Sequence, residues 1–133
     1  MPTEFINPPT LPGTSGWTQV VKHGPGTLVH ISGQAALDAA GNLVGPGDLK
    51  SQTEQTFANL TAALAAAGAT WDQVIVTRIY VVGFHHELLP IIRAVRSRYV
   101  SRDKPPASTL VGVTALAFSD WLIEIEATAL LAD

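Results

Sequence analysis

Two glutamates in one apolar segment are the first residues in this sequence that suggest chemistry. Residues 122–131 form an apolar run that only Glu124, Glu126 and a threonine interrupt. In a β-strand successive side chains point to opposite faces, so both carboxylates would share one face and Ile123 and Ile125 the other. Such a carboxylate can hold a water molecule and exchange a proton with it. The alternative is that this face of the sheet simply meets solvent.

Two other clusters carry weaker signals. His85, His86 and Glu87 are adjacent, and neighbouring residues on a helix point about 100° apart, so we expect no metal site there. Five of the eight Lys and Arg residues fall in or just after one predicted helix. They could hold an anion or RNA, but no aromatic residues alternate with them, and a solvated helix face is the commoner cause of such a cluster. These five residues are Arg93, Arg96, Arg98, Arg102 and Lys104.

Composition limits the class of protein. The 133 residues suit one domain, spanning 1–133, with a real core. The chain is 47% hydrophobic and 14% charged, against roughly 25% charged in an average soluble domain. No apolar run reaches the ~18 residues of a membrane span, and residues 1–13 do not read as a secretory signal. The absence of cysteine excludes thiol chemistry but is neutral about the compartment, and a cytoplasmic location is the default expectation. A net charge of −3 gives no overall attraction to nucleic acid.

Strands and helices alternate along most of the chain, which predicts a single α+β domain. Residues 1–16, rich in Pro and Gly, suit an extended arm. The turn signal at 23–26 predicts a hairpin between its two flanking strands, and the short connection after residue 117 predicts another. The expected strands are 17–22, 27–32, a short piece at 43–44, 74–82, 108–117 and 122–131, and the expected helices are 48–68 and 84–100.

The segment 48–68 is the clearest helix. Asp48 can cap it, and Gly68 is a natural stop. One side has apolar spacing, and we expect the opposite side to be solvated. The apolar stripe consists of Thr53, Phe57, Leu60, Leu64 and Ala67, and the polar side of Gln52, Gln55, Asn59 and Thr61.

The apolar strands predict an oligomer. Two helices can cover one face of a sheet of this size, yet segments 74–82 and 108–117 are apolar on both faces. Another copy of the same chain is the simplest cover for the second face. We therefore expect a homo-oligomer.

Short motifs in a fixed order resemble those of a known family. They are GWTQV (16–20), SGQ (32–34), QTEQTFANL (52–60), AAG (66–68), PA (106–107) and IEIEA (123–127). Across nearly the whole chain, their order and spacing resemble the reactive intermediate deaminase (Rid) family, also known as endoribonuclease L-PSP.

This resemblance implies a chorismate-mutase-like α+β fold, with a sheet of about six strands, two helices on one face and assembly as a homotrimer. It further implies three clefts between subunits and a cofactor-independent reaction, the hydrolysis of a 2-imino acid to a 2-keto acid and ammonia.

The resemblance also suggests site residues. Ser108 stands where typical members have the arginine that holds the substrate carboxylate, so 2-iminopropanoate and 2-iminobutanoate are expected to be poor substrates unless Arg78 or Arg93 substitutes. An asparagine of the family, near residues 90–91, is also absent. Glu124 corresponds to the carboxylate that positions the attacking water, and Glu126 is expected to be structural or solvent-facing. The expected binding residues are Trp17, Ser32, Gly33, Ser108, Leu110 and Glu124.

Three functions remain open at this point. The first is a trimer that binds a small metabolite and hydrolyses an imine, an enamine or a related bond through water held by Glu124. The second is a trimer that binds a small ligand or partner without catalysis. The third, RNA cleavage, rests only on the older family name and on the basic cluster.

Overall fold

The computed structural model describes residues 2–133, and strand β6 (Ile123–Ala132) lies at the centre of its main sheet. It pairs antiparallel with β3 (Gly26–Gln34) on one side and with β4 (Val74–Val82) on the other. Ile123 and Ile125 are fully buried, whereas Glu124 and Glu126 are partly exposed on the opposite face. The alternation predicted for this segment is therefore confirmed.

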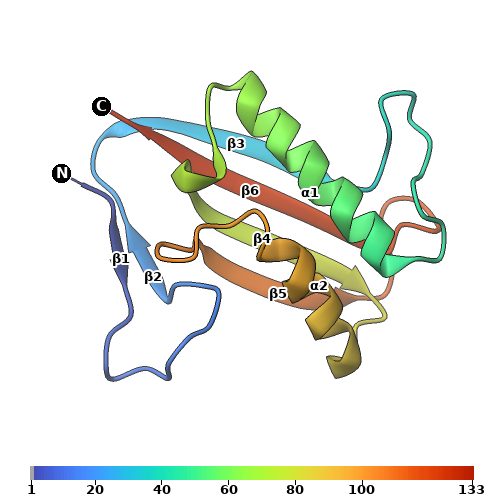
Figure 1. Ribbon diagram of the computed structural model, residues 1–133, viewed down its shortest axis with the longest axis horizontal. Helices are drawn as coiled ribbons and strands as arrows, with labels where there is room; N and C mark the ends of the chain where they lie inside the picture. Colours follow the sequence, from blue (N-terminus) through green and yellow to red (C-terminus); the bar gives the residue numbers. More distant parts are fainter. Residues whose placement is uncertain (1) are drawn as a thin grey trace.

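The main sheet has four strands in the order β3-β6-β4-β5 (Figure 1). Strand β5 (Ala107–Val113) runs parallel to β4 and forms the edge. The predicted C-terminal hairpin is wrong, because β4 lies between β5 and β6. A short connection permits a hairpin but does not require one, and here the antiparallel partner of β6 comes from far upstream.

The predicted N-terminal hairpin is also wrong. Strand β2 (Val20–Lys22) pairs with β1 (Glu4–Ile6) in a separate two-stranded sheet, whereas β3 pairs with β6. The turn after β2 thus carries the chain from the small sheet to the large one. The short strand expected at 43–44 is reduced to one isolated bridge, from Leu37 to Leu43. The six strands therefore form two sheets rather than the single sheet that we expected.

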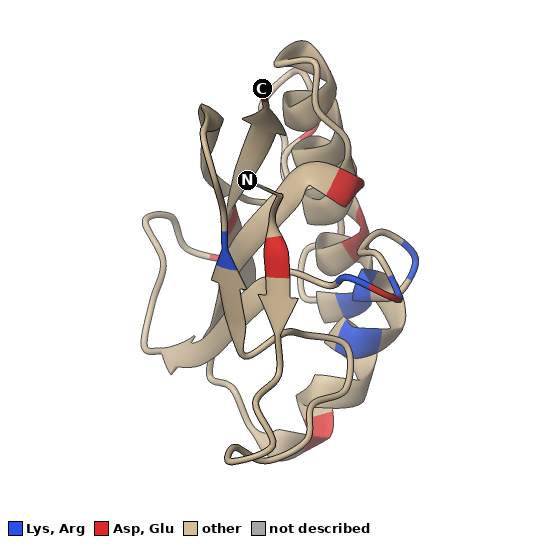
Figure 2. Cartoon of the chain, turned by 90° about the vertical axis from the view of Figure 1, so that its left-hand side faces the viewer, with Lys and Arg blue, Asp and Glu red and all other residues tan. Residues whose placement is uncertain are grey.

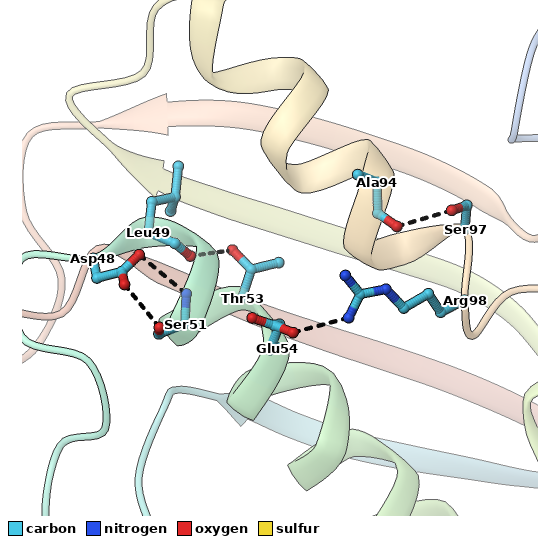
Figure 3. A network of polar contacts seen from close by, with 8 residues as sticks. All are labelled: Asp48, Leu49, Ser51, Thr53, Glu54, Ala94, Ser97 and Arg98. Atoms are coloured by element: carbon cyan, nitrogen blue, oxygen red, sulfur yellow. Dashed lines mark hydrogen bonds and ion pairs between the residues drawn. The ribbon is translucent and has the colours of Figure 1, made fainter.

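Helix α1 (Leu49–Ala66) begins and ends as its capping residues predict. The Asp48 carboxylate accepts hydrogen bonds from the Ser51 backbone N–H at 3.3 Å and the Ser51 hydroxyl at 2.8 Å (Figure 3). These two bonds hold the pKa of Asp48 below its usual value. Gly68 adopts φ +77° just past the end of the helix.

The side of α1 that we expected to be solvated is solvated only in part: Thr61 is exposed, but Gln55 and Asn59 are half-buried. Gln52 is fully buried: it donates to the carbonyls of Gly45 and Asp120, at 3.1 and 3.0 Å, and accepts from the Leu122 N–H at 2.9 Å. Asn59 donates to two carbonyls of the preceding loop. Around Gln52 and Asn59 this side of α1 therefore faces loops rather than water. In the sequence, a polar residue that hydrogen-bonds to loop backbone cannot be told from one that meets solvent.

Within the stripe expected to be apolar, Phe57, Leu60 and Leu64 are buried in the core, whereas Ala67 is exposed. The Phe57 ring packs against the rings of Trp71 and Tyr99, with centroids 5.5 and 5.1 Å away, and those two rings are 6.0 Å apart. These aromatic contacts connect α1 to the segments before β4 and after α2.

Helix α2 (Leu89–Arg96) is shorter than the predicted segment 84–100. A 3₁₀ turn, His86–Leu88, precedes it, and a further turn follows Arg96. Ile92 and Val95 are fully buried beneath it. The ion pair between Arg98 and Glu54, at 2.9 Å, joins the turn after α2 to α1 (Figure 3).

Both helices lie on the same face of the main sheet (Figures 1 and 2). We call the other face, which carries Glu124, Glu126, Arg78 and Tyr80, the open face. No helix within residues 2–133 covers it, and Val111 at its edge is 41% exposed. Of the two strands expected to be buried on both faces, β4 is thus buried mainly on one face within a single chain, and β5, at the edge, has no fully buried residue. None of the helices described here is long and apolar enough to cross a membrane.

Candidate functional site

The side chains of Ser108 and Leu110 point to the helix side of the sheet. In β5 they are paired with Thr77 and Ile79 of β4, which are 2% and 1% exposed beneath the helices. Paired residues of neighbouring strands share a face. The Thr77 hydroxyl donates to the Ser108 hydroxyl oxygen at 3.1 Å, which fixes the position of Ser108 and leaves its own O–H free to donate.

A cavity of about 320 Å³ lies between β5 and α2. It brings together three of the six predicted binding residues, Trp17, Ser108 and Leu110. Four further residues, which the sequence did not assign to a pocket with these three, complete the wall. The lining consists of Trp17, Phe84, Leu89, Arg93, Arg96, Ser108 and Leu110.

Trp17 is held at the cavity by its neighbour in the chain. Thr18 is 1% exposed, its N–H donates to the Pro106 carbonyl at 3.1 Å, and its hydroxyl donates to the Pro105 carbonyl. A β-bridge between Thr18 and Ala107 continues this contact. The GWTQV and PA motifs therefore lie side by side, although about 90 residues separate them in the chain.

Gly33 and Glu124 form a second group, on the open face. The predicted binding residue Ser32 lines a shallow hollow between β3 and α1. Glu124 is the register partner of Tyr80, whose side chain is on the face opposite Ile79. Gly33 lies where the β3–β6 register shifts by one residue, between Ile31 and Gln34. Such bulges often redirect a side chain next to a functional site.

Glycine at position 33 leaves room for the Glu124 carboxylate. A Cβ atom there would lie 2.7 Å from both Cδ and Oε2 of Glu124. Glycine therefore lets the carboxylate pack directly against the backbone of β3. Ser32, beside it, is exposed.

The sheet separates the two groups within one chain. The Ser108 side chain points toward the helices and the Glu124 side chain toward the open face, and β4 lies between their strands. A small ligand in the Ser108 cavity cannot reach Glu124 of the same chain. A complete site that uses both groups needs two copies of the chain.

Arginine placement is the main feature that the sequence left undecided. Of Arg78 and Arg93, the two arginines that could take the place of the family's arginine, Arg93 lines the cavity. Arg78 does not: its register partner is Glu126, on the open face. Arg96, assigned to a solvated helix face, is only 8% exposed and lines the cavity as well. Burial lowers the pKa of Arg96, and the charge of Arg93 lowers it further.

On the open face, Glu126 accepts a hydrogen bond from the Tyr80 hydroxyl at 2.5 Å. This bond, followed by burial, raises the pKa of Tyr80. The contact agrees with the structural role expected for Glu126.

In the part of the chain that the structure describes, no three His, Asp or Glu side chains are grouped as metal ligands would be. His85 is exposed and lies 2.8 Å from Glu87. Its Nδ1 atom is thus already engaged with a single carboxylate.

Comparison with known proteins gives a consistent result. The family model described as Endoribonuclease L-PSP matches residues 10–131. A solved Rid-family protein of unknown function from Yersinia pestis is 40% identical, with a TM-score of 0.88, over 98% of this chain and 100% of that one. A RutC family protein from Pyrococcus horikoshii is 34% identical over 113 residues, 85% of each chain. A 2-iminobutanoate/2-iminopropanoate deaminase from Dermatophagoides farinae is 28% identical over 131 residues, 98% of each.

The mixed four-stranded sheet, the separate two-stranded sheet and the two helices define an α+β fold of the Rid type. The chain belongs to the Rid family, also called the YjgF/YER057c/UK114 or endoribonuclease L-PSP family, which is a family of enamine and imine deaminases.

Proposed function

We propose that this protein is a homotrimer that binds a small organic metabolite between subunits and hydrolyses an imine or enamine with water held by Glu124. The observation that carries the proposal is the division of the predicted site. Trp17, Ser108 and Leu110 line a cavity on one face of the sheet, while Gly33 and Glu124 lie together on the other. Only a neighbouring copy can present the second group to the first.

The open face supports assembly. It carries the partly exposed residues of β4 and β6, and Val111 and Leu28 on the outer strands are 41% and 44% exposed. Exposed apolar side chains across a sheet face are typical of a subunit interface. Light scattering at micromolar concentration should give three times the 14.0 kDa chain mass. A 14.0 kDa particle would contradict the assembly.

The proposed reaction needs no cofactor. The Glu124 carboxylate takes a proton from water as the water oxygen bonds to the imine carbon, and the C=N electron pair moves to nitrogen, which takes that proton from Glu124. Glu124 then carries the hydroxyl proton of the carbinolamine to its nitrogen, so that the oxygen forms the new carbonyl as ammonia leaves. Imine and water are thus converted to carbonyl compound and ammonia. Trp17 provides an aromatic wall and an indole N–H donor.

The test compares wild type with Glu124→Gln, which keeps the size of the side chain and removes the base. Imines of several 2-amino acids are generated in situ by an amino-acid oxidase, and ammonia release is followed above the spontaneous rate. General base catalysis contributes about 10²–10⁴-fold, so kcat should fall by that factor. Equal rates for wild type and Glu124→Gln, both above the spontaneous rate, would refute the role of Glu124.

The second candidate is a trimer that binds a ligand without catalysis. Ser108, at the position where typical family members have an arginine, favours it, since a serine offers one neutral hydrogen bond in place of a charged fork. Wild-type protein that binds metabolites but hydrolyses none of the imines would establish this alternative. RNA cleavage is not part of the proposal, because the chain has a net charge of −3 and its basic residues cluster around one helix.

A further inference from the structure

Two arginines from one turn of α2 face the cavity that contains Ser108. Arg93 and Arg96 are three residues apart, which places them on the same side of the helix. Both line the cavity together with Trp17, Ser108 and Leu110. Figure 2 shows that most Lys and Arg residues gather on α2 and the connection after it.

Arg96 is buried without an acidic partner. It is 8% exposed, and none of the ion pairs in residues 2–133 includes Arg93 or Arg96. Its guanidinium is tightly enclosed: a Cβ at position 16 would lie 2.9 Å from Nη2, so Gly16, at φ +81°, makes room for it. A buried charge without a counter-charge is costly, and an anion in the cavity removes that cost.

We propose that Arg93 and Arg96 bind the carboxylate of an organic acid in this cavity, so that α2 supplies the positive charge that Ser108 cannot. The assignment rests on the proposed function, since it names the class of ligand for the same cleft. A guanidinium presents parallel N–H donors that match the two oxygens of a carboxylate. The free O–H of Ser108 adds a neutral donor.

The other residues that line the cavity determine which ligand body fits beside the carboxylate. Phe84, Leu89 and Leu110 are apolar, and Trp17 adds a flat aromatic surface. At about 320 Å³ the cavity reaches the lower end of the usual size for small-molecule sites. The ligand class is therefore an acid with an apolar or aromatic body, larger than the three- and four-carbon imino acids.

A second hollow adjoins the first and needs a control of its own. It also measures about 320 Å³, and both Arg93 and Arg96 border it. Arg102 lines only this second hollow, and Trp17 only the first. Variants at Arg102 and Trp17 therefore report which hollow holds the acid.

The experiment measures phenylacetate binding to the full chain by calorimetry, with phenylacetamide as the neutral analogue. Hydrogen bonds to charged groups contribute about 1.5–3 kcal/mol, so Arg93→Gln and Arg96→Gln should each weaken phenylacetate binding roughly 10- to 150-fold. Phenylacetamide should bind at least about 10-fold more weakly than phenylacetate to wild type. Trp17→Ala should also weaken phenylacetate binding, because the aromatic wall is lost.

Two variants serve as matched controls. Arg98→Gln removes the same charge from the same segment but breaks only the exposed pair with Glu54, and Arg102→Gln alters only the second hollow. Both should leave the Kd of phenylacetate within about twofold. Arg93 is exposed, so Arg93→Gln keeps the test decisive if Arg96→Gln does not fold.

The assignment is wrong if phenylacetate does not bind to wild type, or if phenylacetamide binds equally well. It is also wrong if the Kd of phenylacetate is unchanged in Arg93→Gln. Finally, it is wrong if Arg102→Gln weakens phenylacetate binding while Trp17→Ala does not. Turnover does not enter this measurement. If imines are hydrolysed and KM is unchanged in Arg93→Gln, the proposed function stands and the arginine assignment is wrong. If no imine is hydrolysed while the arginine variants lose phenylacetate, the assignment stands and the hydrolysis is wrong.

Discussion

Replacing Gly33 by alanine tests the position of the proposed catalytic carboxylate without touching the carboxylate itself. The new Cβ would lie 2.7 Å from Cδ and Oε2 of Glu124, whereas ordinary contact begins at 3.4 Å. The carboxyl group must therefore retreat by about 0.7 Å or rotate away. A misplacement of about 1 Å can cost about 10²-fold in rate, so we expect Gly33→Ala to lower kcat for imine hydrolysis by 10- to 100-fold.

The fold should tolerate this change. Gly33 does not have a positive φ, and the atoms that must move belong to the outer part of a flexible side chain. The melting temperature should thus stay within a few degrees of wild type, since alanine also lowers the entropy of the unfolded chain. Gly13→Ala is the matched control, because no atom lies within 4 Å of a Cβ there. Undiminished kcat in Gly33→Ala would refute the placement of Glu124 in the site.

Two further predictions concern stability and titration. Gln52→Leu removes three buried hydrogen bonds, each contributing about 0.5–1.5 kcal/mol. The free energy of unfolding, measured in urea, should therefore fall by about 1.5–4.5 kcal/mol. A loss no larger than that caused by Gln55→Ala, on the same helix, would contradict this prediction. The bond from Tyr80 to Glu126 raises the pKa of Tyr80, so its stabilisation is complete below about pH 10 and is lost as pH rises through the raised pKa. Phenolate absorbance, assigned by comparison with Tyr80→Phe, should show ionisation of Tyr80 at lower pH in Glu126→Gln than in wild type, and identical titrations would show that the bond is absent in solution.

Local rules explain which parts of the fold the sequence predicted. Strand β4 has the predicted bounds, Val74–Val82, and the alternation of β6 depends only on neighbouring residues. Asp48 caps α1 through a residue three positions further on. In each case the interaction that decides the structure lies within a few residues.

Strand pairing depends on distant partners, and both hairpin predictions failed for this reason. The turn at 23–26 has the composition of a hairpin turn, yet β3 pairs along most of its length with β6, about 100 residues away. The long apolar strand β6 gives β3 a more extensive ladder than the three-residue β2 could. A turn motif alone does not show that a distant strand such as β6 will pair with β3 in place of β2.

The sequence predicted the candidate site only in part, because the site also depends on contacts between residues that are far apart in the chain. The motifs pointed to Trp17, Ser108 and Leu110, and the structure places them around one cavity. Spacing on α2 puts Arg96 next to Arg93, but its burial comes from the loop around Gly16, which folds against it from 80 residues upstream. That packing could not be seen in the sequence of the helix.

Subunit complementation tests most directly the central claim, that each site is shared between two copies. Trp17→Ala damages the cavity half and Glu124→Gln the open-face half, so each variant alone should be nearly inactive in imine hydrolysis. In trimers co-expressed at equal amounts, about a quarter of the clefts combine two intact halves, and activity should recover to about that fraction of wild type. A mixture no more active than the separate variants, with mixed trimers demonstrated by mass spectrometry, would contradict a site built from two copies.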